Sequence, residues 1–158
     1  MSISNDWFDQ LYRKNYPFML AVARNAMGNM NLAEDAVQDS FIMLLLNQDT
    51  VRTYDRPDIW LHKVLLGRIA NIVRRENKRQ HIPLEELTET GAEDTYDIPL
   101  VDLLPQGLKD EEREILILYF EKQLSYEEIS ERLRCSVTTC RTKLFRAKNR
   151  CRDLLKEK

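Results

Sequence analysis

Residues 124–155 have the pattern of a helix-turn-helix whose second helix is basic, and no other stretch of this 158-residue chain constrains its fold as strongly. Ser125 and Glu128 have the spacing of a reciprocal capping pair, which predicts that a first helix begins directly after Ser125. Arg134 stands in the turn, where such motifs often place glycine, so a positive φ costing about 1 kcal/mol is expected there. Ser136 is a residue type that commonly caps a helix, and a longer helix is predicted to follow it.

The second helix of this motif is predicted to have two different faces. Its apolar stripe is formed by Val137, Cys140, Leu144, Cys151 and Leu155. The opposite face combines threonines with cations. A B-DNA major groove admits one such helix, whose early side chains can meet base edges while later cations meet phosphates. A solvated basic face on a packing helix is the alternative. The residues predicted to contact a DNA duplex are Ser136, Thr138, Thr139, Arg141, Thr142, Lys143 and Arg146, and the flanking cations include Lys148, Arg150 and Arg152.

Charge is segregated along the chain, although the formal net charge is only −2. Residues 81–107 contain acidic side chains, prolines and glycines but no Lys or Arg, whereas residues 139–152 contain bases and no acid. A near-neutral total therefore does not argue against nucleic-acid binding, because a phosphate backbone meets the local potential. The acidic stretch predicts a flexible linker between a domain at 1–80 and a second domain at 108–158.

Apolar periodicity predicts further helices at 4–29, 31–46, 59–79 and 108–120, with a turn-rich loop at 47–58. No stretch has the alternation of a strand. The predicted fold class is therefore all-α, with two small helical domains joined by the acidic linker and the helix-turn-helix in the C-terminal domain.

Two features of the predicted N-terminal domain bear on its packing and its surface. Pro17 is expected to break or kink the first helix, because proline lacks a donor and crowds the preceding turn. Asp35, Gln38 and Asp39 are expected on the outward side of the second helix, where they form an acidic ridge available to a basic partner. An acidic solvated face is the plainer alternative.

Several classes of protein are disfavoured by the composition. The N-terminus lacks a basic segment followed by an apolar run, and the longest apolar runs are too short to span a bilayer, so a cytoplasmic location is expected. Cys140 and Cys151 are expected to be buried thiols, while a redox role for Cys135 in the turn stays open. No zinc-ligand spacing, nucleophile–base pair or phosphate-binding glycine loop is present. We therefore expect no metal, no cofactor and no catalysed reaction.

Three stretches resemble one known family, the extracytoplasmic-function sigma factors of bacterial RNA polymerase, which belong to the sigma-70 family. They are LAEDAVQDSF at 32–41, WLHKVLLGRIANIVRR at 60–75 and SYEEISERLRCSVTTCRTKLFRAKNR at 125–150. The resemblance implies that the chain binds core RNA polymerase and promoter DNA, and that a dedicated anti-sigma protein restrains it. Gly67 and Asn71 depart from the family pattern, which has Asn and Asp there.

The resemblance also implies roles for individual residues. The helix from residue 137 would read the duplex of the −35 element. Asp35, Gln38 and Asp39 would contact core polymerase. The loop at 47–58 and the following helix would hold one melted strand of the −10 element, with cations along the backbone and aromatic rings near bases. The residues implied in this second contact are Arg52, Tyr54, Arg56, Trp60, Lys63, Arg74 and Arg75.

Two other functional classes compete with this interpretation. One is a helix-turn-helix regulator that binds operators without polymerase, as a symmetric dimer on paired half-sites. The absence of a heptad seam and the basic flank of 63–79 disfavour it. The other is a helical adaptor that binds only protein, with its bases as solubilising surface. Transcription assays with core polymerase separate all three.

Overall fold

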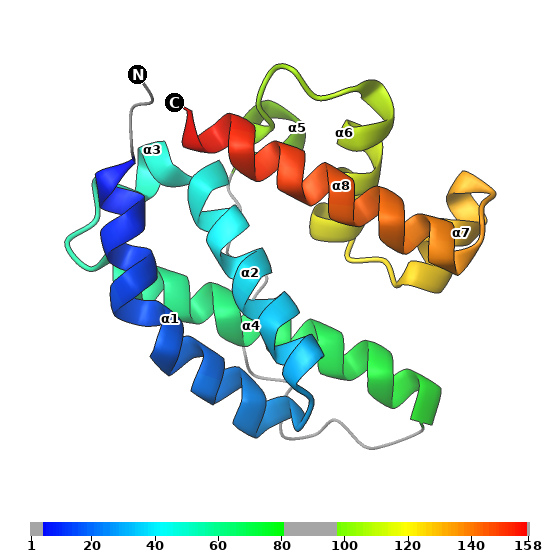
Figure 1. Ribbon diagram of the computed structural model, residues 1–158, viewed down its shortest axis with the longest axis horizontal. Coiled ribbons are helices and arrows are strands. Elements are labelled where there is room, and N and C mark those ends of the chain that lie inside the picture. The colour runs from blue at the N-terminus through cyan, green and yellow to red at the C-terminus, as the bar shows by residue number, and fades with distance from the viewer. Residues whose placement is uncertain (1–4, 81–97, 158) are drawn as a thin grey trace. The chain divides into compact units, whose positions relative to one another are not determined.

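The computed structural model describes residues 5–80 and 98–157, apart from the side chains of residues 76–80. All regular structure in these ranges is helical, which confirms the predicted fold class (Figure 1). The described residues form two compact units, one of residues 5–80 and one of residues 98–157. Most of the predicted linker, residues 81–97, lies outside the described residues.

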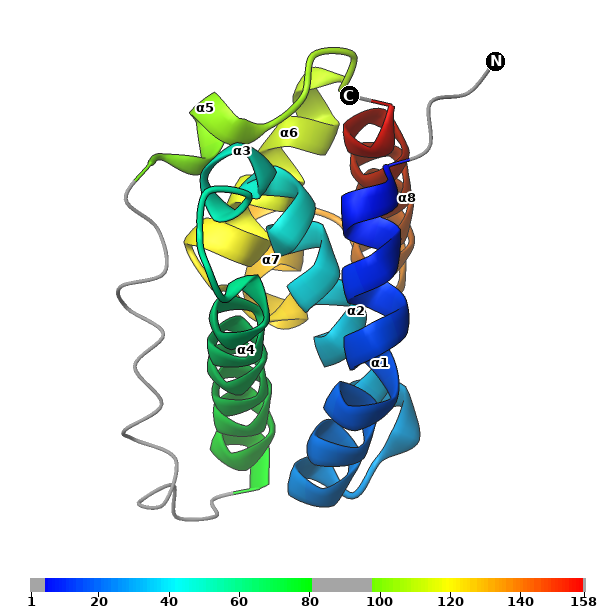
Figure 2. The same cartoon turned by 90° about the vertical axis from the view of Figure 1, so that its left-hand side faces the viewer.

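The N-terminal unit contains four helices: α1 (Asp6–Met27), α2 (Met30–Leu46), α3 (Gln48–Val51) and α4 (Pro57–Gln80). The three long helices α1, α2 and α4 pack against one another pairwise (Figure 2). Apolar side chains from all three fill the space between them, and burying each contributes about 1.5–3 kcal/mol. Large core residues of this unit include Phe8, Met19, Phe41, Met43, Leu61 and Leu65.

The structure corrects two sequence-based expectations for the boundaries of α1 and α2. Pro17 lies inside α1 and does not break it, because Pro17 is on the exposed side and buried residues before and after it hold the helix. The carbonyl that loses its donor at Pro17 can be hydrated there. α2 begins one residue earlier than expected, at Met30, because Asn29 is its cap and the Asn29 side chain accepts a hydrogen bond from the Leu32 N–H.

The C-terminal unit contains α5 (Leu100–Leu103), α6 (Asp110–Leu116), the π-helical turn η3 (Ile117–Glu121), α7 (Tyr126–Leu133) and α8 (Val137–Lys156). The sequence predicts one α-helix at 108–120, whereas the structure changes from α6 to π-helix at Ile117. Residues 98–107 fall within the predicted linker, yet they include α5 and group with this unit. Leu100 and Leu104 are buried, which explains why this segment does not behave as a solvated tether.

No helix in the described part of the chain is both long enough and apolar enough to cross a membrane. α8 buries one face and exposes the other, whereas α4 is exposed on one side near its start and buried all round at residues 67–72.

The burial predicted for Cys140 and Cys151 is confirmed, whereas Cys135 is half-buried. Burial raises the pKa of the Cys151 thiol to about 12 and also raises the pKa of Cys140. A raised pKa means that both thiols stay protonated at pH 8. Because the thiolate is the reactive form, they are poor nucleophiles in the folded protein.

We therefore expect an alkylating reagent at pH 8 to modify Cys135 in the native protein, and all three cysteines only after denaturation. Cys151 should react at least about a hundredfold more slowly in the folded than in the unfolded chain. Mass spectrometry of peptides after timed labelling measures both rates, and Cys135→Ser is the control for the native signal. Equal labelling of the three thiols in the native protein would contradict this account.

Candidate nucleic-acid interface

The turn between α7 and α8 is fixed by local hydrogen bonds that the sequence predicts. Ser125 and Glu128 form the reciprocal pair, with Ser125 Oγ accepting from the Glu128 N–H and Glu128 Oε1 accepting from the Ser125 N–H. Arg134 adopts the expected left-handed conformation, with φ 56° and ψ 49°. Ser136 Oγ then accepts from the Thr139 N–H at 3.1 Å and caps α8. These bonds set the angle at which α8 leaves the turn.

The two faces of α8 are those expected from its sequence. Cys140, Leu144, Cys151 and Leu155 are buried, as is Ala147 between them. α8 packs this face against α6 and α7. The outward face begins at the capped end of the helix, so its first two turns can enter a groove. The candidate duplex contacts Ser136, Thr138, Thr139, Arg141, Thr142, Lys143 and Arg146 are all exposed.

Two of these candidate side chains are already oriented by neighbours. The Arg141 guanidinium lies 5.1 Å from the ring centroid of Tyr126, a cation–π contact that directs the side chain along α7. Thr142 Oγ1 donates to the Thr138 carbonyl at 3.2 Å, which holds the hydroxyl against the helix while its oxygen can still accept a hydrogen bond. Preorganised side chains lose less entropy when they bind.

Lys148 does not belong to the basic face where the sequence analysis placed it. It is only 8% exposed, and its ammonium lies 4.2 Å from the ring centroid of Tyr119 and 5.9 Å from that of Phe120. Tyr119 and Phe120 belong to η3, a segment distant in sequence, so helical periodicity could not reveal this contact. Lys148 is a buried part of the domain core.

Phe145 is a surface residue that the sequence analysis missed. It lies on α8, is 66% exposed and is flanked in sequence by Leu144, which is buried, and Arg146, which is exposed. At 100° per residue it falls on the same side of α8 as Thr138 and Thr142. An exposed aromatic ring among threonines and arginines is the signal that could have identified it, because apolar groups contact thymine methyls in the major groove.

In the N-terminal unit, Arg52 is held by residues of its own domain. Its Nη2 donates to Asn5 Oδ1 at 2.8 Å and to Gln48 Oε1 at 3.2 Å, and the guanidinium lies 4.6 Å from the Trp7 ring centroid. Asn5 also donates to Gln48 and caps α1. Arg52 therefore ties the loop after α3 to the start of α1, which is a positioning role that the sequence analysis did not anticipate.

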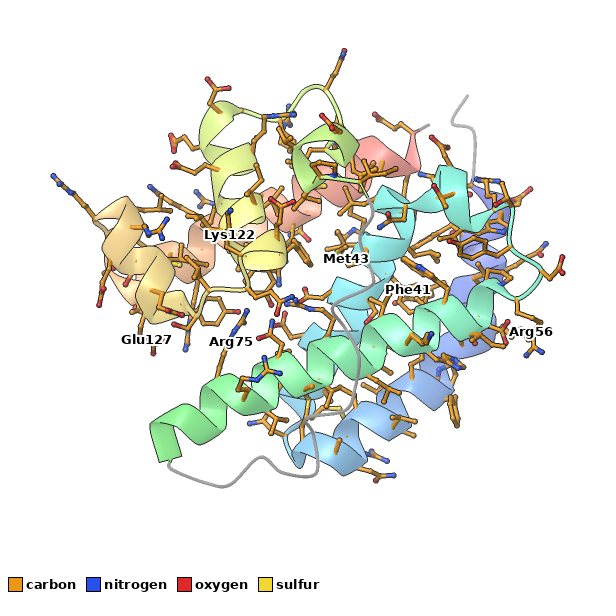
Figure 3. All side chains as sticks on the ribbon, turned by 180° about the vertical axis from the view of Figure 1, so that it is seen from behind. Phe41, Met43, Arg56, Arg75, Lys122 and Glu127 are labelled. Carbon is orange, nitrogen blue, oxygen red and sulfur yellow. The ribbon has the colours of Figure 1, made fainter. Side chains whose placement is uncertain are left out.

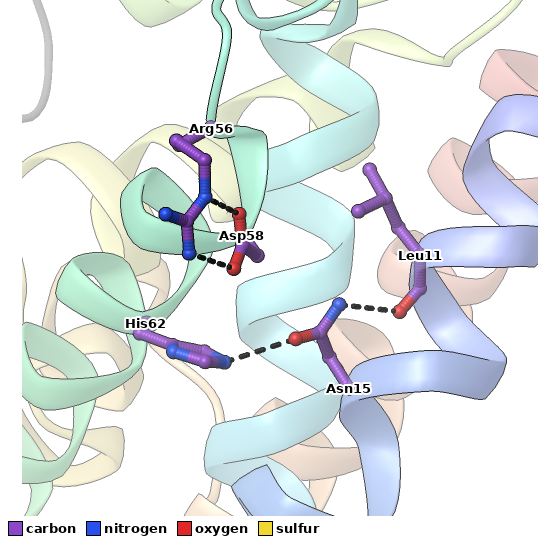
Figure 4. A network of polar contacts seen from close by, with 5 residues as sticks. All are labelled: Leu11, Asn15, Arg56, Asp58 and His62. Carbon is purple, nitrogen blue, oxygen red and sulfur yellow. Dashed lines mark hydrogen bonds and ion pairs between the residues drawn. The ribbon is translucent and has the colours of Figure 1, made fainter.

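Arg56 and Asp58 form a two-contact ion pair at the start of α4, with Nε–Oδ1 at 3.2 Å and Nη2–Oδ2 at 3.1 Å (Figure 4). The hydrogen bond to Arg56 lowers the pKa of Asp58, and the Asp58 carboxylate raises the pKa of Arg56. Arg56 nevertheless projects outward and stays largely exposed, so a phosphate can approach it (Figure 3). Tyr54, in the same loop, is 44% exposed and offers a ring to a base.

The remaining candidates for the melted strand lie along α4. Lys63 and Arg74 are exposed, whereas Trp60 and Arg75 are half-buried. Arg74 and Arg75 are more than two helical turns from Lys63, so they can reach a different phosphate. Asn71, which departs from the family pattern, is buried on this helix, and its Nδ2 has no hydrogen-bond partner among the described residues.

His62 is a second residue that the sequence analysis did not assign to this surface. Its Nε2 lies 3.1 Å from Asn15 Oδ1, while the Asn15 amide donates to the Leu11 carbonyl (Figure 4). Because Asn15 Oδ1 can only accept, this contact is a hydrogen bond in the tautomer with N–H at His62 Nε2. The His62 ring also lies 5.4 Å from the ring of Phe18, which is exposed. His62 and the exposed ring of Phe18 therefore form an aromatic pair between α4 and α1.

The ridge predicted on α2 is only partly available. Asp39 is fully buried, and its Oδ2 lies 3.1 Å from Nη2 of Arg68 on α4, itself 4% exposed. The sequence analysis places Asp39 on the outward side, but this long-range ion pair turns it inward. Asp35 and Gln38 are half-buried, and Gln38 Nε2 donates to the Tyr12 hydroxyl at 3.1 Å. These two half-buried side chains are the part of the ridge that remains at the surface.

In the described ranges, no cluster of three or more His, Cys, Asp or Glu side chains could hold a metal ion. Apart from the acidic ridge of α2, the surfaces described above consist of cations, hydroxyl groups and aromatic rings, which suit nucleic acid.

Comparison with known proteins connects both units to one family. A family model of sigma-70 region 2 matches residues 11–79, and a model of sigma-70 region 4 matches residues 101–151. The chain is 31% identical to the RNA polymerase sigma factor YlaC of Bacillus subtilis, over 90% of this chain and 88% of the relative. It is 33% identical to SigV of the same organism, over 75% and 73%, and 26% identical to the ECF sigma factor SigM, over 92% and 91%.

The burial of Lys148 leads to a prediction about stability. We expect Lys148→Ala to destabilise the C-terminal unit by about 2 kcal/mol, because it removes a desolvated cation–π contact and a packed aliphatic stem. The matched exposed substitution Lys143→Ala should change stability by no more than about 0.5 kcal/mol. Hydrogen exchange of amides in α8 reports the opening of this unit alone. Equal effects of the two substitutions would contradict the burial.

Proposed function

Because this chain belongs to the extracytoplasmic-function group of the sigma-70 family, we propose that it is a transcription initiation factor that binds core RNA polymerase and directs it to specific promoters. The observation that carries this proposal is the occurrence, in order, of a region 2 match and a region 4 match on two separate helical units. Operator-binding regulators and protein-only adaptors do not require this combination.

The C-terminal unit is proposed to bind the −35 duplex through α8. The exposed threonines and Arg141, Lys143 and Arg146 stand at the capped end of a helix whose other face is buried, which supports insertion into a major groove. Phe145 joins this surface as a contact for thymine methyl groups. Because threonine can pair with several base edges, the arginines and Phe145 would supply most of the discrimination among sequences.

The N-terminal unit is proposed to hold one melted strand of the −10 element. Tyr54, His62 and Trp60 would offer rings to unstacked bases, while Arg56, Lys63, Arg74 and Arg75 would meet phosphates. Base–aromatic stacking is worth about 1–3 kcal/mol per base, enough to offset the few kcal/mol needed to extrude one. Arg52 would position the Tyr54 loop through its contacts with Asn5 and Gln48, so its effect on DNA is indirect.

Core polymerase is proposed to dock on α2, at the half-buried side chains of Asp35 and Gln38. Asp39 is left out of this surface and assigned to the internal ion pair with Arg68.

Neither DNA contact need be tight alone, because joining two binding units raises the effective concentration of the second. The chain would act by recruitment and would catalyse no reaction itself. It would act in the cytoplasm, and a dedicated anti-sigma protein is the expected regulator.

Transcription with purified components tests the proposal. Core polymerase, this chain and genomic DNA fragments should give transcripts that begin at defined sites, whereas core polymerase alone should not. An operator-binding regulator would bind duplex as a dimer without producing those transcripts. Failure to bind core polymerase, together with dimeric binding to duplex alone, would reject the initiation-factor proposal in favour of a regulator.

For the −35 surface, we expect Arg141→Ala and Arg146→Ala each to reduce transcription from a −35-dependent promoter by about tenfold, the size of one lost charged contact to DNA. Core binding should be unchanged in both variants. Arg24→Ala, which removes an exposed arginine in the last turn of α1, is the matched control. Run-off transcription and pull-down with core polymerase measure the two effects. Unchanged transcription in both variants would reject this surface.

For the polymerase surface, we expect Asp35→Arg to abolish core binding, because it reverses the charge that a basic partner would meet. Asp35→Asn should weaken binding less. Glu131→Arg, on an exposed position of α7, controls for the change in net charge. Pull-down measures the binding, and thermal unfolding verifies that the N-terminal unit is intact. Full core binding by a folded Asp35→Arg protein would remove this assignment.

A further inference from the structure

Residues 98–107 form a strap that is fastened to the C-terminal unit by side chains from three other elements. At its start, Glu121 Oε2 at the end of η3 accepts a hydrogen bond from the Leu100 N–H at 2.9 Å. α5 has no side-chain cap of its own at Pro99, so Glu121 supplies the missing acceptor. Leu100 and Leu104 of the strap are themselves buried, so apolar packing also holds the strap to this unit.

Arg113 of α6 binds the middle of the strap through both terminal nitrogens of its guanidinium. Nη1 donates to the Pro105 carbonyl at 3.1 Å and Nη2 donates to the Val101 carbonyl at 3.2 Å. These two carbonyls lie near the end of α5, where a short helix leaves its acceptors free. A planar guanidinium can serve two acceptors at once, which a lysine ammonium does with less geometric precision.

The end of the strap is attached to the proposed recognition helix itself. Arg150 of α8 donates to the Gly107 carbonyl at 3.2 Å, and its Nε lies 3.5 Å from Glu112 Oε1. Gly107 has a φ of 105°, and a Cβ there would lie 3.3 Å from the Leu154 methyl carbons, so only glycine fits without strain. Arg150, which the sequence analysis counted among the cations of the basic flank, therefore connects α8 to the strap.

We propose that this strap sets the reach between the two DNA-binding units, and that Arg113 is a positioning residue for promoter spacing. The proposal rests on the proposed function, in which residues 81–97 join the two units. With the strap fastened, the connection ends at Ile98. With the strap released, it would end at Gly107, and each added residue extends the reach by up to about 3.5 Å.

The expected size of the effect follows from polymer behaviour. Effective concentration falls roughly as the −3/2 power of the length of the connection, so extending it from 81–97 to 81–107 lowers that concentration by about twofold. Each added base pair between the two promoter elements moves the duplex contact by about 3.4 Å. A fastened strap therefore favours one spacing, and a released strap tolerates longer ones.

The experiment measures transcription by core polymerase with the full chain on promoters whose two elements are separated by a series of spacer lengths. The readout is a ratio of transcript yields: the yield at the best spacer length divided by the yield at a spacer that is longer by two base pairs. This ratio does not depend on how much active protein is present. We expect Arg113→Ala to reduce this ratio by at least about twofold, Arg113→Lys to reduce it less, and Arg132→Ala, an exposed arginine on α7, to leave it unchanged.

Three further tests keep the experiment decisive. Hydrogen exchange of the free variants should be faster in residues 100–107 and unchanged in α8, and Glu121→Ala should act in the same direction as Arg113→Ala. An insertion between residues 90 and 91 of a Gly/Ser segment as long as residues 98–107 should mimic release of the strap. Unchanged spacer ratios despite faster exchange, or unchanged exchange in Arg113→Ala, would overturn the proposal. If the wild-type chain supports initiation at no spacer length, the proposed function is rejected, and the result does not bear on the strap.

Discussion

The buried apolar face of α8 is the constraint on which the C-terminal unit depends. Leu144, Cys151 and Leu155 pack against the preceding helices, and the Ser136 cap and the left-handed Arg134 fix where this helix begins. Because that face is buried, the threonines and arginines of α8 lie on its solvent-exposed side. The capacity of α8 to enter a groove is therefore a consequence of core packing, since the polar face adds little to the stability of the fold.

Local sequence signals are sufficient to predict much of the fold and to select the candidate duplex-binding residues. Ser125, Glu128 and Ser136 have the spacing of caps, and caps act within one helical turn, so the sequence reveals them directly. The apolar stripe of α8 follows from periodicity in the same way. Proline is a weaker guide, because Pro17 could be accommodated on the exposed side of α1 once packing held both ends of that helix.

Two of the errors concern charged residues whose partners are distant in sequence: Asp39 pairs with Arg68, and Lys148 lies over the rings of Tyr119 and Phe120. The hydrogen bond from Arg52 to Asn5 is a third long-range contact that helical periodicity does not predict. A helical pattern assigns a charged residue to a surface, and it contains no information about an ion pair or aromatic ring contributed by another helix. The same limitation hid the strap. Arg150 is expected on the basic flank of its helix, and no local pattern in the sequence indicates that Arg113 and Arg150 donate to backbone carbonyls.

The central claim is that α8 faces promoter duplex while polymerase holds the N-terminal unit. Site-specific photo-crosslinking tests it most directly, with a photoreactive residue placed at Thr142 in a complex of the chain, core polymerase and promoter DNA. The account predicts crosslinks to base pairs of the upstream element, and none from the same probe at buried Leu144 in a folded variant. Crosslinks from position 142 only to polymerase subunits would contradict it.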